Sequence, residues 1–115
     1  MTARDDGAVQ VVDEPSEQRY AARLGGRVVG FTEYRAVRGR LILFHTEVDP
    51  SVKSRGVGSR LASAALDDIR ARGLNVSVKC PFIAAFMERH PEYQDLRAGP
   101  GRLGSGRVNE VLGGR

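Results

Sequence analysis

The feature that most limits the fold of this chain is a strand, a loop, a helix and a second strand in direct succession. Apolar strands are predicted at 41–48 and 75–79, and the helical segment between them ends at Arg72-Gly73. A helix that joins two strands of one sheet makes a right-handed crossover, so these strands should run parallel. The chain is therefore expected to contain a β-α-β unit.

The segment after Gly58 has the pattern of an amphipathic helix. Its apolar residues recur at helical spacing and form one stripe: Leu61, Ala62, Ala65, Leu66 and Ile69. Gly73 can adopt the left-handed conformation that often follows a helix. We expect this helix to begin between Gly56 and Ser59 and to end near Arg72.

The loop before this helix is a candidate anion site. A helix N-terminus presents unpaired N–H groups and the positive end of the helix dipole, which suit a phosphate. Gly56 and Gly58 would let a ligand approach the backbone closely, and cations surround the same point: Lys53, Arg55 and Arg60. The pattern is neither a nucleotide P-loop nor a dinucleotide fingerprint. A tight strand-to-helix turn would also explain the two glycines.

Length, charge and cysteine content exclude several classes of protein. A chain of 115 residues is one domain with one core, and its net charge of +4 favours anionic partners without specifying them. The single cysteine, Cys80, excludes an internal disulfide, and no Cys and His spacing suggests a metal site. Because no leader-like start or membrane-spanning apolar run is present, we expect a cytoplasmic protein without a membrane partner.

The segments before residue 41 are predicted to be antiparallel strands joined by hairpins. The expected elements are strands at 8–12, 18–24 and 27–36, with turns at Gly25-Gly26 and Arg38-Gly39. In the third strand, either Val29 and Phe31 or Val28 and Tyr34 face inward, and the sequence leaves both registers open. The strand 41–48 is apolar on both alternating faces, so we expect it to be central and covered on both sides.

The chain after residue 79 is predicted to contribute a last helix and a tail. Pro81 suits a first helical turn, and an apolar stripe follows it: Phe82, Ile83, Phe86 and Met87. Six glycines and little apolar content between 97 and 115 predict a disordered Gly/Arg tail. We expect a flexible N-terminus over 1–7 and one folded domain over 8–96.

Four motifs together resemble one family. Lys53-Ser54-Arg55-Gly56-Val57-Gly58 is similar to the Arg/Gln-x-x-Gly-x-Gly/Ala motif of the GNAT N-acetyltransferase superfamily. The chain also contains His45-Thr46-Glu47-Val48, Cys80-Pro81-Phe82 and Arg89-His90-Pro91-Glu92-Tyr93, and with them it resembles the small stand-alone GNAT-like domains.

The resemblance implies a reduced GNAT fold of the α/β (α+β) class. Its sheet would be mixed and mostly antiparallel, with one parallel β-α-β crossover and a C-terminal helix. Two helices near the start and two strands at the end of most members have no counterpart here. Because those parts help to form the acceptor pocket, an open site or an unusual acceptor is implied.

The resemblance also implies acetyl-CoA as the cofactor. Backbone N–H groups at the start of the helix would bind the pyrophosphate, and the pantetheine arm would bond to the strand backbone near Glu47. The thioester would then lie close to Cys80. The expected cofactor-binding residues are Glu47, Val48, Lys53, Ser54, Arg55, Gly56, Val57, Gly58, Ser59, Arg60, Cys80 and Phe82.

Three residues are catalytic candidates. Cys80 lies between a strand end and a helix start, where a thiolate could accept the acetyl group, although a buried cysteine that packs like an apolar residue is the alternative. Glu47 and His45 are alternate residues of one strand and could take the proton of an amine. A strand-end carboxylate and a core histidine are their structural alternatives. His90, at a helix end, is expected to cap the last carbonyls.

The resemblance thus implies an acetyl-CoA-binding N-acetyltransferase whose amine acceptor, a small molecule or a protein, is unidentified. The alternative is a non-catalytic acyl-CoA sensor or interaction module, which the missing acceptor elements favour. Nucleic-acid binding is disfavoured because aromatic residues make up 6% of the chain and Trp is absent. We expect a monomer or a weak dimer.

Overall fold

A computed structural model describes residues 9–97, in which five strands form one sheet. The start expected at 1–7 and all but the first residue of the tail expected at 97–115 lie outside the described residues. The strands are β1 (Gln10–Glu14), β2 (Arg19–Leu24), β3 (Arg27–Val37), β4 (Arg40–Val48) and β5 (Asn75–Val78). The α-helices are α1 (Val57–Ala71) and α2 (Pro81–Arg89), and the 3-10 helices are η2 (Pro15–Glu17), η3 (Pro50–Arg55) and η4 (Pro91–Arg97).

The sheet has the strand order β1-β2-β3-β4-β5. The first four strands pair antiparallel, and β5 pairs parallel to β4 after the crossover through α1. Gly25 and Gly26 turn the β2–β3 hairpin with φ angles of 60° and 83°, a conformation that glycine adopts without steric cost. The expected mixed sheet with one parallel crossover is confirmed.

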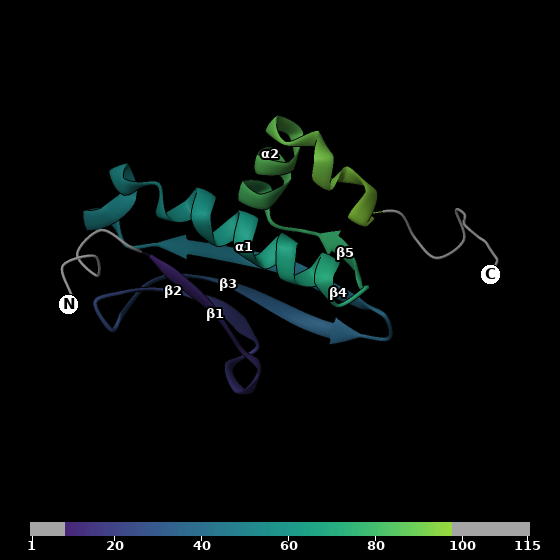
Figure 1. Cartoon of the computed structure of the whole chain (residues 1–115), viewed down its shortest axis with the longest axis horizontal. Helices are drawn as coiled ribbons and strands as arrows, with labels where there is room; N and C mark the ends of the chain where they lie inside the picture. The colour runs from purple at the N-terminus through teal and green to yellow at the C-terminus, as the bar shows by residue number, and fades with distance from the viewer. Residues whose placement is uncertain (1–8, 98–115) are drawn as a thin grey trace.

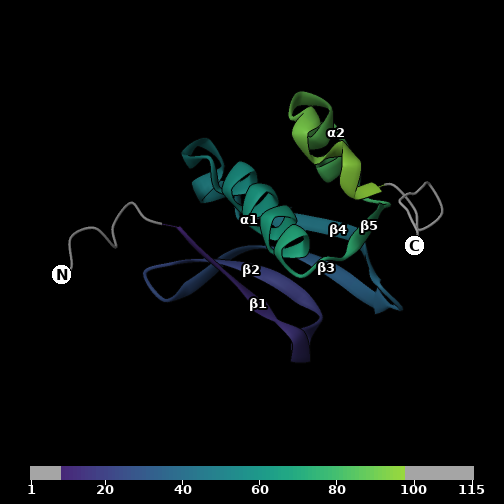
Figure 2. The same ribbon diagram turned by 45° about the vertical axis from the view of Figure 1, so that its right-hand side comes forward.

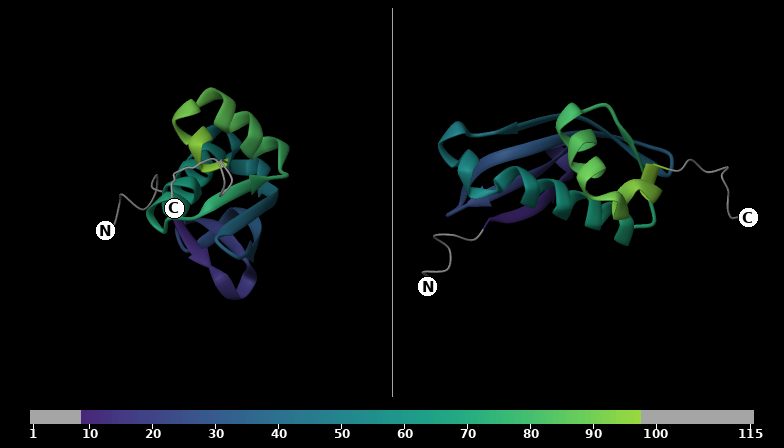
Figure 3. Two further views of the ribbon diagram at one scale, coloured as in Figure 1. Left: turned by 90° about the vertical axis from the view of Figure 1, so that its right-hand side faces the viewer. Right: turned by 90° about the horizontal axis from the view of Figure 1, so that it is seen from above.

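Both α-helices lie on the same face of the sheet, so the described molecule has two layers (Figures 1 and 2). α1 contacts all five strands, whereas α2 contacts β4, β5 and α1 (Figure 3). The predicted stripe of α1 is completely buried: Leu61, Ala62, Ala65, Leu66 and Ile69. Since burial of one large aliphatic side chain contributes about 1.5–3 kcal/mol, this helix supplies much of the core.

The expectation that both faces of β4 are covered is wrong. No described helix lies on the face opposite α1, and Phe44 is 36% exposed there. A bulge then interrupts the alternation, because Leu43 pairs with Tyr34 while His45 pairs with Glu33, which leaves Phe44 as the extra residue. The side chains therefore change faces along the strand. We call the uncovered side, which carries Phe44, His45 and Glu47, the open face.

A second bulge settles the register of β3. Ala22 pairs with Gly30 and Arg23 pairs with Val28, so Val29 is the extra residue. Val29 and Tyr34 are both buried, one from each of the two alternatives. Neither simple alternation holds along the whole strand.

The helix η4 was not predicted from the sequence. It packs Leu96 into the core, and the hydroxyl of Tyr93 donates to Asp67 Oδ1 over 2.8 Å. Arg70 of α1 donates to both carboxylate oxygens of Asp95, over 2.9 and 2.8 Å. These contacts fix η4 to α1. No helix within 9–97 is long and apolar enough to cross a membrane.

Candidate functional site

The two parallel strands diverge after Leu43. Leu43 and Val78 are their last paired residues, and Lys79 N–H donates to the Leu43 carbonyl over 2.8 Å. Beyond this point β4 pairs, among the described residues, with β3 alone. We call residues 44–48 and 79–82 the β4–β5 fork.

The loop into α1 begins at a well-bonded aspartate. Asp49 accepts hydrogen bonds from the N–H of Ser51 over 2.9 Å and from its hydroxyl over 2.8 Å. These bonds, together with the bond from Arg27, lower the pKa of the Asp49 carboxyl. The aspartate therefore remains ionised and holds the first turn of η3.

Gly56 joins η3 to α1 in the left-handed conformation, with φ of 74°. Space is open where a Cβ atom would lie, so its backbone is accessible. The N–H of Arg60 donates to the Gly56 carbonyl over 3.1 Å and makes the first bond of the helix. The N–H groups of residues 57–59 therefore lie before the first bond of the helix and have no partner within it, as expected for an anion site. α1 starts where the sequence predicted.

Gly58 has a different environment from Gly56. A Cβ atom at this position would lie 2.6 Å from Cζ of Phe82, so the ring of Phe82 occupies the adjacent space. Phe82 lies in the first turn of α2 and is 37% exposed. In this structure the ring of Phe82 requires a small residue at position 58.

A cleft of about 470 Å³ lies between the first half of α1 and the end of α2. It is lined by Arg55, Gly56, Ser59, Arg60, Ser63, Phe86 and His90. The Arg60 guanidinium also donates to the carbonyl of Val9 over 3.1 Å, which anchors it at this edge. Four predicted cofactor-binding residues thus share one cleft, which also has a cationic rim.

The predicted loop residues Lys53 and Val57 do not line this cleft. Lys53 and Ser54 belong to η3, and the Lys53 side chain is exposed. Val57 is completely buried, and its Cγ1 lies 3.5 Å from where a Cβ atom on Gly30 would be. Its side chain therefore anchors the start of α1 against β3.

His90 contributes to the cleft wall from α2. Its imidazole stacks on Phe86 with ring centroids 4.2 Å apart. The cap at the end of α2 is made by its backbone N–H, which donates to the Met87 carbonyl over 3.2 Å. The cap is therefore made by the backbone and not by the imidazole, which is placed toward the cleft.

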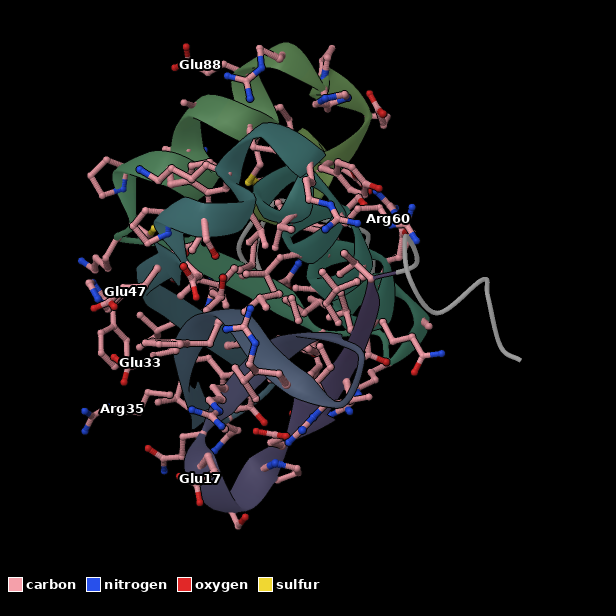
Figure 4. The ribbon with its side chains drawn as sticks, turned by 90° about the vertical axis from the view of Figure 1, so that its left-hand side faces the viewer. Glu17, Glu33, Arg35, Glu47, Arg60 and Glu88 are labelled. Carbon is pink, nitrogen blue, oxygen red and sulfur yellow. The ribbon has the colours of Figure 1, made fainter. Side chains whose placement is uncertain are left out.

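On the open face, His45 and Glu47 form a pair. Nε2 of His45 lies 2.8 Å from Oε2 of Glu47, and both side chains are exposed. Figure 4 shows Glu47 on the same side of the molecule as Glu33 and Arg35. A hollow of about 270 Å³ lies next to Glu47, with Phe31 in its wall. The two residues share a strand face as predicted, and His45 is not a core histidine.

Cys80 lies on the opposite, helix-covered side of the sheet. It is 3% exposed, and its thiol lies 3.1 Å from the hydroxyl oxygen of Thr46. That hydroxyl lies 3.0 Å from the hydroxyl of Thr32, which is completely buried. Cys80 is thus buried, as the alternative to a catalytic role required, but it also belongs to a chain of polar contacts that the sequence did not reveal.

Comparisons with known proteins agree with this architecture. A sequence model of the GCN5-related N-acetyl-transferase family matches residues 19–96, which is most of the chain. The chain belongs to this family. It is similar to protein NATD1 of Mus musculus, with 32% identity over 94 residues that cover 78% of this chain and 84% of NATD1. With NATD1 of Bos taurus, the identity is 34% over 92 residues, or 76% of this chain and 80% of that protein.

Solved structures of the GCN5-related family have the same fold. A GCN5-like protein from Staphylococcus aureus superposes with a TM-score of 0.59 at 21% identity, over 89% of this chain and 95% of that chain. The ribosomal-protein-S18-alanine N-acetyltransferase of Escherichia coli superposes with a TM-score of 0.55 at 19% identity, over 76% of this chain and 56% of that chain. At such identities the likeness shows the fold alone.

Within this GCN5-related fold, the three catalytic candidates do not meet as one cluster. Cys80 faces the helix layer, whereas His45 and Glu47 face the open side, with β4 between them. Thr46 and Thr32 were missed because only the cross-strand pairing of β3 with β4 brings them together. The signal that could have found Thr46 is its place between His45 and Glu47 in the motif.

Proposed function

We propose that this member of the family binds acetyl-CoA at the β4–β5 fork and transfers the acetyl group to an amine, with Cys80 as the first acceptor. The observation that carries the proposal is the fork itself. There the N-terminus of α1, the stretch of β4 that among the described residues pairs with β3 alone, and the single cysteine of the chain come together. Each of them suits one part of an acyl-CoA thioester.

The nucleotide end of acetyl-CoA would lie at α1. The N–H groups of residues 57–59 would bind the pyrophosphate, and Gly56 leaves the backbone accessible to it. Arg60 and Arg55 add a positive rim to the cleft, where they attract the CoA phosphates. The pantetheine arm would then follow β4 near Glu47 and Val48 as an added strand.

The chemistry would take place on the helix-covered side of β4, where Cys80 lies. Sγ of Cys80 attacks the thioester carbonyl, a new C–S bond forms, and the CoA sulfur leaves with the proton that Cys80 gives up. An amine then attacks the cysteine thioester, the C–S bond to Cys80 breaks, and the thiolate takes up the proton that the amine loses. His45, held by Glu47, lies on the open face and would take the proton of an amine only in a direct transfer from acetyl-CoA on that side.

Intact-protein mass spectrometry after mixing with acetyl-CoA tests this proposal. We expect a non-covalent adduct under native conditions and a covalent acetyl group under denaturing conditions, which Cys80→Ala abolishes. A native adduct without a covalent one, with turnover of amines preserved in Cys80→Ala, would favour direct attack by the amine. Absence of an adduct under both conditions would contradict the proposal.

A non-catalytic acyl-CoA sensor is the second candidate. It is supported by the open face, because no described element covers the side on which His45 and Glu47 lie. A transferase usually shelters its acceptor from water. Binding of acetyl-CoA without turnover over a broad panel of amines and proteins would identify the sensor.

A further inference from the structure

Thr32 is an unexpected residue for its position. Apart from the tyrosines and Cys80, it is the only buried side chain with a polar group among those that the structure describes, and its exposure is zero. Burial of a hydroxyl is costly unless the group is hydrogen-bonded, and valine has the same branched shape without that cost. The informative question is therefore what the hydroxyl of Thr32 does.

The hydroxyl of Thr32 leads to Cys80 through Thr46. Thr32 and Thr46 are directly opposite each other on β3 and β4, with their Oγ1 atoms 3.0 Å apart. The Cys80 thiol donates to Thr46 Oγ1 over 3.1 Å. A cross-strand threonine pair that only stabilised the sheet would need no third partner.

We propose that Thr46, supported by Thr32, is a positioning residue for the Cys80 sulfur in the acyl transfer proposed above. Each hydroxyl can donate one hydrogen bond and accept others. When Cys80 is a thiol, it donates to Thr46, and Thr46 donates to Thr32. When Cys80 has lost its proton, Thr32 donates to Thr46, and Thr46 donates to the thiolate.

This reversal requires only that two hydroxyl hydrogens rotate. With Cys80 as a thiol or as a thiolate, each of the two contacts, at 3.0 and 3.1 Å, contains one hydrogen, so no heavy atom has to move. A bond to a charged acceptor is stronger than a bond from a neutral thiol, which is a weak donor. The pair therefore favours the thiolate inside an otherwise apolar pocket and fixes its direction.

The test is an ultraviolet titration of thiolate absorbance in the protein without acetyl-CoA. Because Cys80 is the single cysteine, subtraction of the Cys80→Ala titration removes the contribution of the tyrosines. We expect the midpoint to lie about one to two pH units higher in Thr46→Val than in the wild type. Thr46→Ser, which keeps the hydroxyl, should restore it.

A structural role alone would not move this midpoint. Urea unfolding of each variant separates the two effects, because loss of packing lowers the free energy of unfolding without a change in thiolate titration. Equal midpoints in folded Thr46→Val and in the wild type would overturn the proposal. If Thr46→Val does not fold, Thr32→Val and Thr32→Ser carry the same comparison, with a smaller expected shift.

The titration and the proposed function can fail separately. If the acyl transfer is correct, covalent acetylation of Thr46→Val at neutral pH should be about 10- to 100-fold slower and should recover as the pH rises. If the midpoint shifts but the wild type never acquires an acetyl group, the hydroxyl pair still positions Cys80 and the proposed function is wrong.

Discussion

Gly58 and Phe82 show how one missing side chain decides the position of another. Alanine at position 58 would place its Cβ atom 2.6 Å from the ring of Phe82, so the ring must move. Alanine is also the better helix former, by about 0.5–1 kcal/mol in a helix interior. The two effects oppose each other in the single variant.

We predict that Gly58→Ala is more favourable in a Phe82→Ala background than in the wild type, by about 0.5 kcal/mol or more. The reason is that removal of the ring leaves only the gain in helix propensity. Urea unfolding of the four proteins of this cycle measures the coupling. Equal effects in both backgrounds would show that the ring is not held against position 58.

The raised pKa values of two tyrosines predict how the free energy of unfolding changes at high pH. Burial, and then the hydrogen bond to Asp67, raise the pKa of Tyr93 to about 12, and burial with a bond to Asp13 does the same for Tyr34. In the unfolded chain this pKa is about 10. Between these pH values the folded protein therefore binds more protons than the unfolded chain. The stability that the two tyrosines contribute is lost as the pH rises through this range.

The free energy of unfolding should therefore be lower at about pH 11 than at about pH 9. Tyr93→Phe should reduce this pH dependence, because the group that titrates is gone. Urea unfolding of both proteins at the two pH values checks it. If the free energy of unfolding changes as much between the two pH values in Tyr93→Phe as in the wild type, the Tyr93 phenol does not have the raised pKa that its burial and its bond to Asp67 predict.

At the scale of elements, η4 depends on its apolar contacts more than on its ion pair. Leu96 is 4% exposed, whereas Arg70 and Asp95 are 44% and 60% exposed. We predict that Leu96→Ala lowers the free energy of unfolding by about 2–4 kcal/mol and that Arg70→Ala lowers it by less than about 1 kcal/mol. Chemical denaturation of both variants tests the ranking, and a reversed order would contradict it.

The outer side of β4 provides a second comparison of elements. Truncation of a fully enclosed phenylalanine to alanine costs about 3–5 kcal/mol. Because Phe44 lies on the open face, we predict about 1 kcal/mol for Phe44→Ala and about 2–4 kcal/mol for its buried neighbour in Leu43→Ala. Similar losses in the two variants would mean that the open face is covered in solution.

The sequence predicted those elements that follow from local periodicity. The stripe of α1, its start at Gly56, its end at Gly73 and the glycine turns all rest on residues close together in the chain. The bulges at Val29 and Phe44 could not be predicted, because they depend on which residues of a neighbouring strand are paired. The two-sided apolar pattern of β4 was misread for a different reason, because an apolar residue such as Phe44 can remain partly exposed on an uncovered face.

At the scale of the whole molecule, the candidate site was predicted by residue but not by arrangement. The motif placed the glycine loop and Cys80 in one family, and the fold brings both to the fork. The division of Cys80 from His45 follows from the bulge in β4, which no local pattern reveals. Thr32 lies too far away in sequence to be associated with Cys80 before the strand order is known.

Ligand binding gives a prediction for the molecule as a whole. If acetyl-CoA binds at α1, a concentration of about 100 times Kd should stabilise the fold by about 2.7 kcal/mol, seen as a rise in Tm. Gly56→Glu should abolish this rise, because it places a carboxylate where the pyrophosphate would lie.

Gly39→Glu is the matched control for that variant. Gly39 has φ of 70° and open space, so the same substitution strains the backbone similarly, but it lies at the other end of β4. The Gly39→Glu protein should keep its response to acetyl-CoA. Loss of the response in both variants would point to backbone strain rather than to a phosphate site.

The two edges of the sheet have a consequence for self-association. β5 has four residues, and Asn75 at its start donates to the carbonyl of Leu96, so η4 lies beside this edge. At the other edge, Glu14 of β1 is ion-paired with Arg19 and Arg23. Short, flanked or charged edges resist the addition of further strands. Residues 9–97 can therefore leave one face of the sheet without a covering helix and still offer no template for fibre growth.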